Sequence, residues 1–135
     1  MERRDAQDLL DQWHLAQNEY YAGGDEHRLE ILLTPDVQWS VPGDNPLAGV
    51  YDGIEDVLGY MRRRRRLAGC TLRLVRRDVL VGRGHRIAAL TDGVALRSGS
   101  VHTWETVGLY DIEGGRIRRC WLLPLDVAAF DAIWT

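Results

Sequence analysis

Four consecutive segments in the second half of the chain have the composition of β-strands and are joined by short turns that contain glycine. Each segment is rich in β-branched, aromatic and leucine side chains. The segments cover residues 70–81, 85–97, 100–112 and 115–125. The turns are Gly82-Arg83-Gly84, Arg97-Ser98-Gly99 and Glu113-Gly114-Gly115. Because such short connections join neighbouring strands that run in opposite directions, the pattern predicts an antiparallel meander of four strands.

The first half of the chain has helical spacing instead. Apolar residues from Ala6 to Tyr20 recur every three or four positions, and Gln17 shares this spacing. The pattern predicts a helix over 5–22. A second helix is expected from Asp25 to Leu33, where Thr34-Pro35 stops it. The elements expected next are a strand over 37–41, a loop over 42–46, a helix from Gly53 to its basic end at Arg62 to Arg66, and a short last helix capped by Asp126.

This order predicts an α+β fold with helices on one face of a curved antiparallel sheet. Long twisted strands curl, so the sheet should form a cone whose hollow is covered by the N-terminal helices. We expect a single domain over 1–135, with one apolar pocket between helices and sheet that binds a small hydrophobic molecule.

Composition excludes several classes of function. Apolar residues make up 45% of the chain and charged residues 27%, and the net charge is −3, so neither nucleic acid nor a membrane surface is expected as a partner. The chain has no lysine, which excludes Schiff-base chemistry. Cys70 and Cys120 are interpreted as reduced core thiols. The charged N-terminus and the lack of a long apolar run predict a cytoplasmic location.

Several short groups of residues occur together in one known family. They are Trp39 through Pro42-Gly43, Pro46 through Gly53, Trp104 through Tyr110, Gly115-Arg116-Ile117, and Trp121. With these groups the chain resembles the SnoaL-like polyketide cyclases, within the ketosteroid isomerase and nuclear transport factor 2-like superfamily. The resemblance implies the cone-shaped α+β fold. Isomerases, cyclases, dehydratases, epoxide hydrolases and non-catalytic domains share that fold, so the activity depends on the site residues.

Ketosteroid isomerase chemistry needs a carboxylate base and an oxyanion hole formed by a tyrosine and a protonated aspartate. We anchored the comparison on Pro42, Gly24-Asp25 and Gly115-Arg116-Ile117. The base then falls on Val41, the tyrosine on Gln17 and the aspartate on Gly108. All three required residues are therefore missing, so the isomerisation typical of that enzyme is not expected.

Limonene epoxide hydrolase chemistry needs an aspartate, an arginine and a second aspartate. When the comparison is anchored on Trp121, these fall on Asp92, Leu90 and Leu123, and only the first matches. SnoaL-like cyclisation needs little beyond an acid/base group beside an enolisable substrate. The candidates for that group are Asp92, His102 and Asp126, in cofactor-free chemistry with no metal.

Each catalytic candidate also has a structural interpretation. Asp126 precedes a helical segment and suits an N-cap, and Asp92 precedes Gly93 in a pair typical of turns or bulges. His102 shares strand parity with Trp104, so the two should face the same way. The remaining histidines, His14, His27 and His85, are expected to be peripheral.

The large aromatic residues are expected to line the pocket, some of them as substrate contacts. They are Trp13, Tyr20, Trp39, Trp104 and Trp121. The run Arg62 to Arg66 is interpreted as a solvated helix end, because five successive helical residues surround the axis.

The leading hypothesis is therefore a SnoaL-like protein that binds a cyclic or polyketide-like molecule. The alternative is a non-catalytic domain that forms a homodimer through the outer face of its sheet, where Ala88, Leu90, Val107 and Leu109 would lie. The location of Asp92, His102 and Asp126 discriminates between an enzyme and a binding domain.

Overall fold

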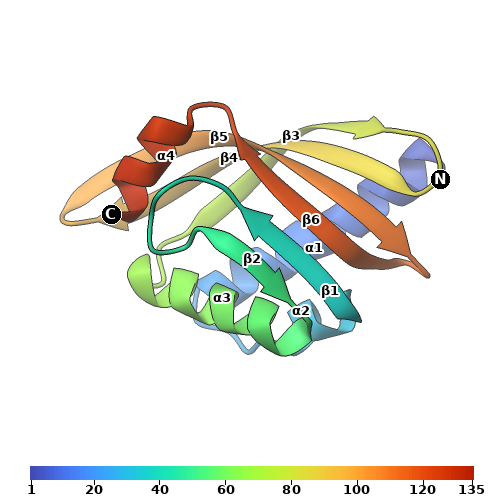
Figure 1. The fold of residues 1–135 in the computed structure, drawn as a ribbon, viewed down its shortest axis with the longest axis horizontal. Coiled ribbons are helices and arrows are strands. Elements are labelled where there is room, and N and C mark those ends of the chain that lie inside the picture. The colour runs from blue at the N-terminus through green and yellow to red at the C-terminus, as the bar shows by residue number, and fades with distance from the viewer.

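The computed structural model describes all residues from Met1 to Thr135 as four helices and six strands (Figure 1). The helices are α1 (Arg3–Tyr21), α2 (His27–Ile31), α3 (Ile54–Leu67) and α4 (Val127–Trp134). The strands are β1 (Leu33–Val41), β2 (Gly49–Asp52), β3 (Arg73–Val81), β4 (Arg86–Arg97), β5 (Ser100–Glu113) and β6 (Arg116–Pro124). None of the four helices combines the length and the apolar character needed to span a bilayer.

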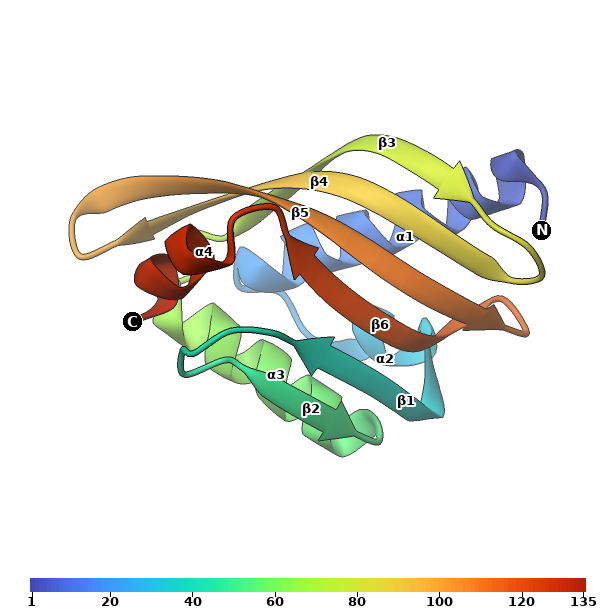
Figure 2. The ribbon, with the colours of Figure 1, turned by 45° about the horizontal axis from the view of Figure 1, so that its top comes forward.

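The strands form one mixed sheet in the order β2-β1-β6-β5-β4-β3. Strands β3 to β6 form the expected antiparallel meander, whereas β1 joins it parallel to β6. Figure 2 shows the sheet bent, with α1 lying along β3 and α3 against β1 and β2. The sheet does not close, because β2 and β3 are both edge strands. The α+β class and the curved sheet covered by helices are thus confirmed.

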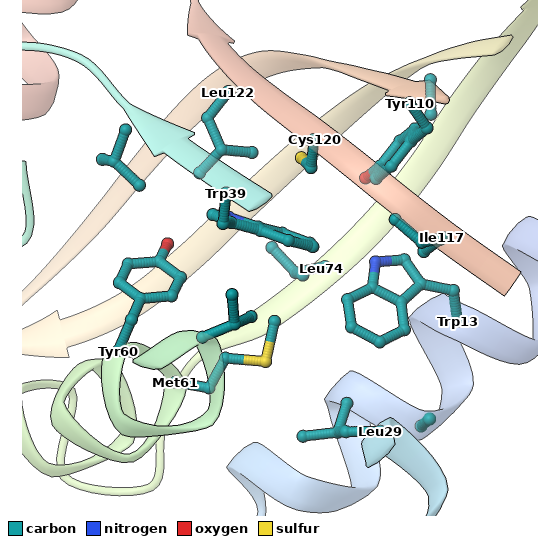
Figure 3. Close-up of a cluster of buried hydrophobic side chains, with 14 of the residues drawn as sticks. Trp13, Leu29, Trp39, Tyr60, Met61, Leu74, Tyr110, Ile117, Cys120 and Leu122 are labelled. Carbon is teal, nitrogen blue, oxygen red and sulfur yellow. The ribbon is translucent and has the colours of Figure 1, made fainter. Parts of the chain in front are cut away.

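The core lies between the helices and the inner face of the sheet, and its centre is aromatic (Figure 3). The ring of Trp39 on β1 lies 5.6 Å from that of Trp13 on α1. It lies 6.4 Å from the rings of Tyr60 on α3 and Tyr110 on β5. Such tilted and edge-on contacts each contribute about 0.5–1.5 kcal/mol beyond area burial. Trp39 therefore joins both large helices to the sheet.

The structure differs from the sequence prediction at the entry to the sheet. The second helix ends at Ile31, and Leu33 and Thr34 already belong to β1. The backbone N–H of Ile117 donates to the carbonyl oxygen of Leu32 at 2.8 Å, so pairing with β6 begins there. Strand β2 was not predicted, because its four residues have no buried alternation and are recognisable only by their pairing with β1.

Two local interpretations are wrong. Cys70 is exposed, in the turn after α3, and only Cys120 is a core thiol. The Asp92-Gly93 pair forms no turn. It lies in the middle of β4, in continuous register with β5. Gly93 is required there by packing, since a Cβ atom at this position would lie 2.3 Å from the indole ring of Trp104.

We therefore expect Gly93→Ala to lower the free energy of unfolding by about 1–3 kcal/mol, as other overpacking substitutions do. Gly59→Ala is the matched control, because a Cβ atom on this helical residue meets nothing within 4 Å. It should raise the free energy of unfolding by about 0.5–1 kcal/mol through helix propensity. Urea denaturation measures both variants, and equal stability of the two would contradict the packing role of Gly93.

Candidate functional site

A small, partly open cavity lies where α1 and α3 cross the inner face of the sheet. Its volume is about 30 Å³, close to that of one or a few water molecules. Two helices and five strands contribute to its wall. The lining residues are His14, Gln17, Trp39, Arg64, Leu74, Thr91, Gly93, Trp104, Thr106, Gly108, Tyr110 and Leu122. Only five of these twelve residues are hydrophobic, so the cavity is more polar than the apolar pocket that the sequence predicted.

Several of the polar groups in the wall lack a hydrogen-bond partner. The buried atoms without a partner include Nδ1 of His14, Oε1 of Gln17, Nε1 of Trp39, Nε of Arg64 and Oγ1 of Thr106. Buried polar groups in folded proteins are almost always paired, since each unpaired group costs about 1–3 kcal/mol. Five such atoms around one cavity have no partner within the protein, so their partners have to be water or another polar molecule inside the cavity.

Arg64 is the one charged side chain of the cavity wall, and it is only 4% exposed. It is not part of any salt bridge of the chain. Its guanidinium lies 5.6 Å from the ring centre of Tyr21, 6.0 Å from that of Tyr60 and 5.9 Å from that of Trp134. These distances are near the outer limit for a cation–π contact, so the charge is only weakly compensated.

The phenols around Arg64 do not supply a negative charge. Burial raises the pKa of Tyr21, Tyr60 and Tyr110 above the ordinary value, which keeps all three hydroxyls protonated at neutral pH. Burial likewise raises the pKa of the Cys120 thiol. No carboxylate lines the cavity. The interior therefore carries a net positive charge.

His14 is not peripheral, as the sequence suggested, but is 7% exposed and part of the cavity wall. Burial, together with the nearby charge of Arg76, lowers its pKa from 6.5 to about 4. The imidazole is therefore neutral at pH 7 and acts as a hydrogen-bonding group.

The three catalytic candidates all lie outside the cavity. Asp92 projects from the outer face of β4, where its carboxylate accepts from Arg77 at 2.7 Å. Asp126 caps α4 by accepting from the backbone N–H of Ala129 at 3.0 Å. The two aspartates border the same open groove on the outer surface, together with Glu105. His102 faces inward like Trp104, but farther along β5, beyond the cavity. Catalytic roles for these three residues stay a prediction.

The five aromatic candidates divide between three locations. Trp39 and Trp104 line the cavity. Trp13 is buried in the core behind Trp39, and Tyr20 packs under the guanidinium of Arg65 at 4.5 Å. Trp121 lies on the outer face of β6 beneath Arg86, 5.3 Å from ring centre to guanidinium, where it cannot contact a ligand in the cavity.

The structure also tests the two anchored comparisons. Gln17 and Gly108, the positions assigned to the isomerase oxyanion hole, do line the cavity, but they are not the tyrosine and the aspartate of that enzyme. The positions that were assigned by anchoring on Trp121 do not line the cavity. Leu90 and Leu123 face outward like Asp92, so that alignment is out of register with the inner face. A shift of one residue along a strand reverses the side on which every residue lies.

Arg64 was missed because the arginine run was interpreted as solvated throughout. It follows Met61 by three positions and Val57 by seven, so it lies on the buried face of α3. That spacing was available in the sequence. His14 gave no comparable signal, because it borders the apolar stripe of α1 and only the packing of β3 to β5 above it decides its burial.

One family model matches most of the chain. Residues 15–120 match the family model described as a SnoaL-like domain. An uncharacterised protein of Mycobacterium tuberculosis is 32% identical over 114 residues, which cover 84% of this chain and 87% of that protein. The equivalent uncharacterised protein of Mycobacterium bovis matches to the same extent.

Solved structures share the fold at low sequence identity. Bal32a, from a soil-derived mobile gene cassette, has a TM-score of 0.85 at 21% identity, covering 97% of this chain and 99% of its own. TerC, co-crystallised with polyporic acid, has a TM-score of 0.77 at 19% identity, covering 96% and 97%. A putative isomerase from Rhodopseudomonas palustris has a TM-score of 0.76 at 16% identity, covering 90% and 91%.

The lowered pKa of His14 makes stability depend on pH. Between pH 6.5 and about 4 the unfolded chain binds a proton at His14 that the folded protein does not bind. Stability should therefore fall with decreasing pH in this window, by up to about 3 kcal/mol from this group. Urea denaturation at a series of pH values measures the slope. His14→Gln should flatten it, whereas the control His27→Gln, which removes an exposed imidazole, should not. An unchanged slope in His14→Gln would refute the assignment.

Proposed function

The chain belongs to the SnoaL-like domain family, and we propose that it binds a small cyclic or polyketide-like molecule in the internal cavity between α1, α3 and the sheet. The observation that carries this proposal is the set of unpaired polar atoms around a cavity that is otherwise walled by Trp39, Trp104, Leu74 and Leu122. Apolar walls with a few convergent polar groups are typical of small-molecule sites.

The ligand must enlarge the cavity when it binds. A volume of about 30 Å³ is well below the roughly 300 Å³ at which drug-sized ligand pockets begin. Unpaired polar groups make the narrow cavity costly, which favours its widening when a ligand supplies their partners. That TerC, a chain of the same fold, was co-crystallised with polyporic acid supports an organic ligand for this one.

Binding is favoured over catalysis because the cavity wall has no carboxylate that could serve as a base. His14 is the one imidazole there, and with a pKa of about 4 it is a poor proton acceptor at pH 7. A cofactor-free cyclase or isomerase would have to use this group or the carboxylates of the outer groove. We also propose that the protein is located in the cytoplasm.

The outer face of the sheet favours a second function, association of two copies of this chain. Side chains of β4, β5 and β6 form an apolar strip in which Leu90 lies beside Val107, Val107 beside Leu123, and Leu109 beside Trp121. Charged pairs border the strip, Arg77 with Asp92 at one end and Arg86 with Asp111 at the other. An apolar centre with a polar rim is the usual arrangement of a protein interface.

The binding proposal can be tested with the tryptophans themselves. The protein is labelled with 5-fluorotryptophan, its five resonances are assigned with single Trp→Phe variants, and neutral 2-naphthol is added to millimolar concentration. We expect saturable shifts of the Trp39 and Trp104 resonances, because these rings line the cavity. Trp121 on the outer face is the internal control and should not shift. Shifts confined to Trp121, or none at all, would refute binding in the cavity.

The dimer proposal predicts that Leu109→Arg converts a dimer into a monomer. A charge placed in the centre of an apolar interface is desolvated without a partner on the other copy. Leu15→Arg is the control, because Leu15 is 53% exposed on α1, away from the sheet. Light scattering after size exclusion should give twice the chain mass for the protein and for Leu15→Arg. A monomeric starting protein would contradict the proposal.

A further inference from the structure

We propose that the molecule bound in the cavity is an anion, and that Arg64 is the residue that binds its negatively charged oxygens. The inference rests on the proposed function, because it assigns a charge class to the ligand of the same cavity. The class is a flat apolar ring system that bears a carboxylate, or an acidic phenol or enol in its ionised form. The starting observation is that Arg64 is the single arginine of its run that faces the interior.

The other arginines of the run either have a partner for their guanidinium or are exposed, although Nε of Arg63 is also buried without a partner. Arg62 forms an ion pair with Glu26, and Arg63 donates to the hydroxyl of Tyr51 at 2.6 Å. Arg65 donates to the carbonyl oxygens of Tyr20 and Gly24. Arg66 is exposed. Arg64, in contrast, is the most buried of the five and has neither a carboxylate nor a hydrogen-bonding carbonyl, only the hydroxyl of Tyr21 as a hydrogen-bonding neighbour.

Removing a charge from water is strongly unfavourable unless a partner compensates it. Arg97 shows how this chain treats a half-buried arginine. Its guanidinium donates to the carbonyl oxygens of Ile133 at 3.1 Å and Leu67 at 2.8 Å. Arg64 has only the neutral hydroxyl of Tyr21 beside it and faces a cavity, so a negative charge that compensates it has to come from a molecule inside that cavity. A guanidinium carries only donors, arranged as a fork that matches two oxygens of one anion.

The neighbouring groups suit an anion as well. The indole N–H of Trp39 and the hydroxyl of Thr106 are buried donors without a partner in the same wall. The carbonyl end of Gln17 is a buried acceptor, which fits a protonated hydroxyl elsewhere on the ligand. Leu74, Leu122 and the ring of Trp104 supply the apolar wall for the ring system. A cationic ligand is excluded, because it would lie beside the positive charge of Arg64 and the cavity wall has no carboxylate to bind it.

The test compares two probes of equal shape that differ in charge, 2-naphthoate and 2-naphthamide. Both have to open the cavity to the same extent, so that cost cancels in the ratio of their dissociation constants. A charge-assisted hydrogen bond contributes about 1.5–3 kcal/mol, so we expect the protein to bind 2-naphthoate roughly 10- to 100-fold more tightly. Calorimetric titration at pH 7 measures both constants.

The ratio should fall to near one in Arg64→Met, which keeps the volume and removes the charge. Arg64→Lys should restore part of the preference, because it keeps the charge and loses the fork. Arg63→Met is the matched control. It removes a guanidinium one residue away that contacts Tyr51 and does not line the cavity, and it should leave the ratio unchanged. Without ligand, Arg64→Met should also have a higher Tm than the parent protein.

Each other outcome overturns the inference. Equal affinity for the two probes refutes the role of charge and leaves the proposed binding function standing. Failure of both probes to bind refutes the binding function and the inference together, with the cavity then holding water only. A preference for 2-naphthoate that persists in Arg64→Met assigns the recognition to another group. A lower Tm of Arg64→Met with an unchanged ratio makes Arg64 a packing residue.

Discussion

The alternation of side chains along the four strands of the meander decides which residues meet inside the protein. On β4 and β5 the inward positions are occupied by Thr91, Gly93, Trp104, Thr106 and Tyr110. The outward positions of the same strands hold Asp92, Leu90, Val107 and Leu109. Because the sheet is curved and its concave side is covered by α1 and α3, the inward set forms one cavity wall. The outward set forms an apolar strip with charged ends.

Within this arrangement the buried charge of Arg64 is the feature that ordinary fold stability does not explain. The core around it is aromatic and well packed, with Trp39 in contact with Trp13, Tyr60 and Tyr110. A hydrophobic residue at this position would be compatible with such a core. Natural proteins accept local destabilisation of this kind mainly at functional sites. The charge of Arg64 and the unpaired atoms of Gln17, Trp39 and Thr106 share one cavity, so a single anionic ligand accounts for all four.

The sequence predicted the meander, its turns and the cap of α4 because each depends on local chemistry. In each case the residues that determine the structure lie within a few positions of one another in the sequence. This holds for the alternation along a strand, for the glycine-containing turns and for the cap formed by the Asp126 side chain. Strand β2 and the parallel pairing of β1 with β6 could not be predicted in this way. Both depend on partners distant in sequence, as the pairing of Trp39 with Cys120 illustrates.

The candidate site was harder to predict than the fold, and particular residues show why. Trp39, Trp104 and Trp121 were all expected to line the pocket, and the first two do, whereas Trp121 lies on the opposite face. Whether Asp92 and Asp126 can have a catalytic role depends on whether their side chains point toward the cavity or away from it. The composition of the sequence does not determine this. Arg64 could have been found by extending the helical spacing of Val57 and Met61 by one turn, regardless of polarity.

The most direct measurement of the central claim is a crystal structure of the protein as purified, with attention to the density in the cavity beside Arg64. The account predicts density for a planar molecule, with two of its oxygens roughly 2.7–3.0 Å from the guanidinium nitrogens and the ring system between Trp39 and Trp104. Crystals soaked with 2-naphthoate should show the same arrangement. A cavity that contains only one or two ordered waters in both crystals would contradict the account.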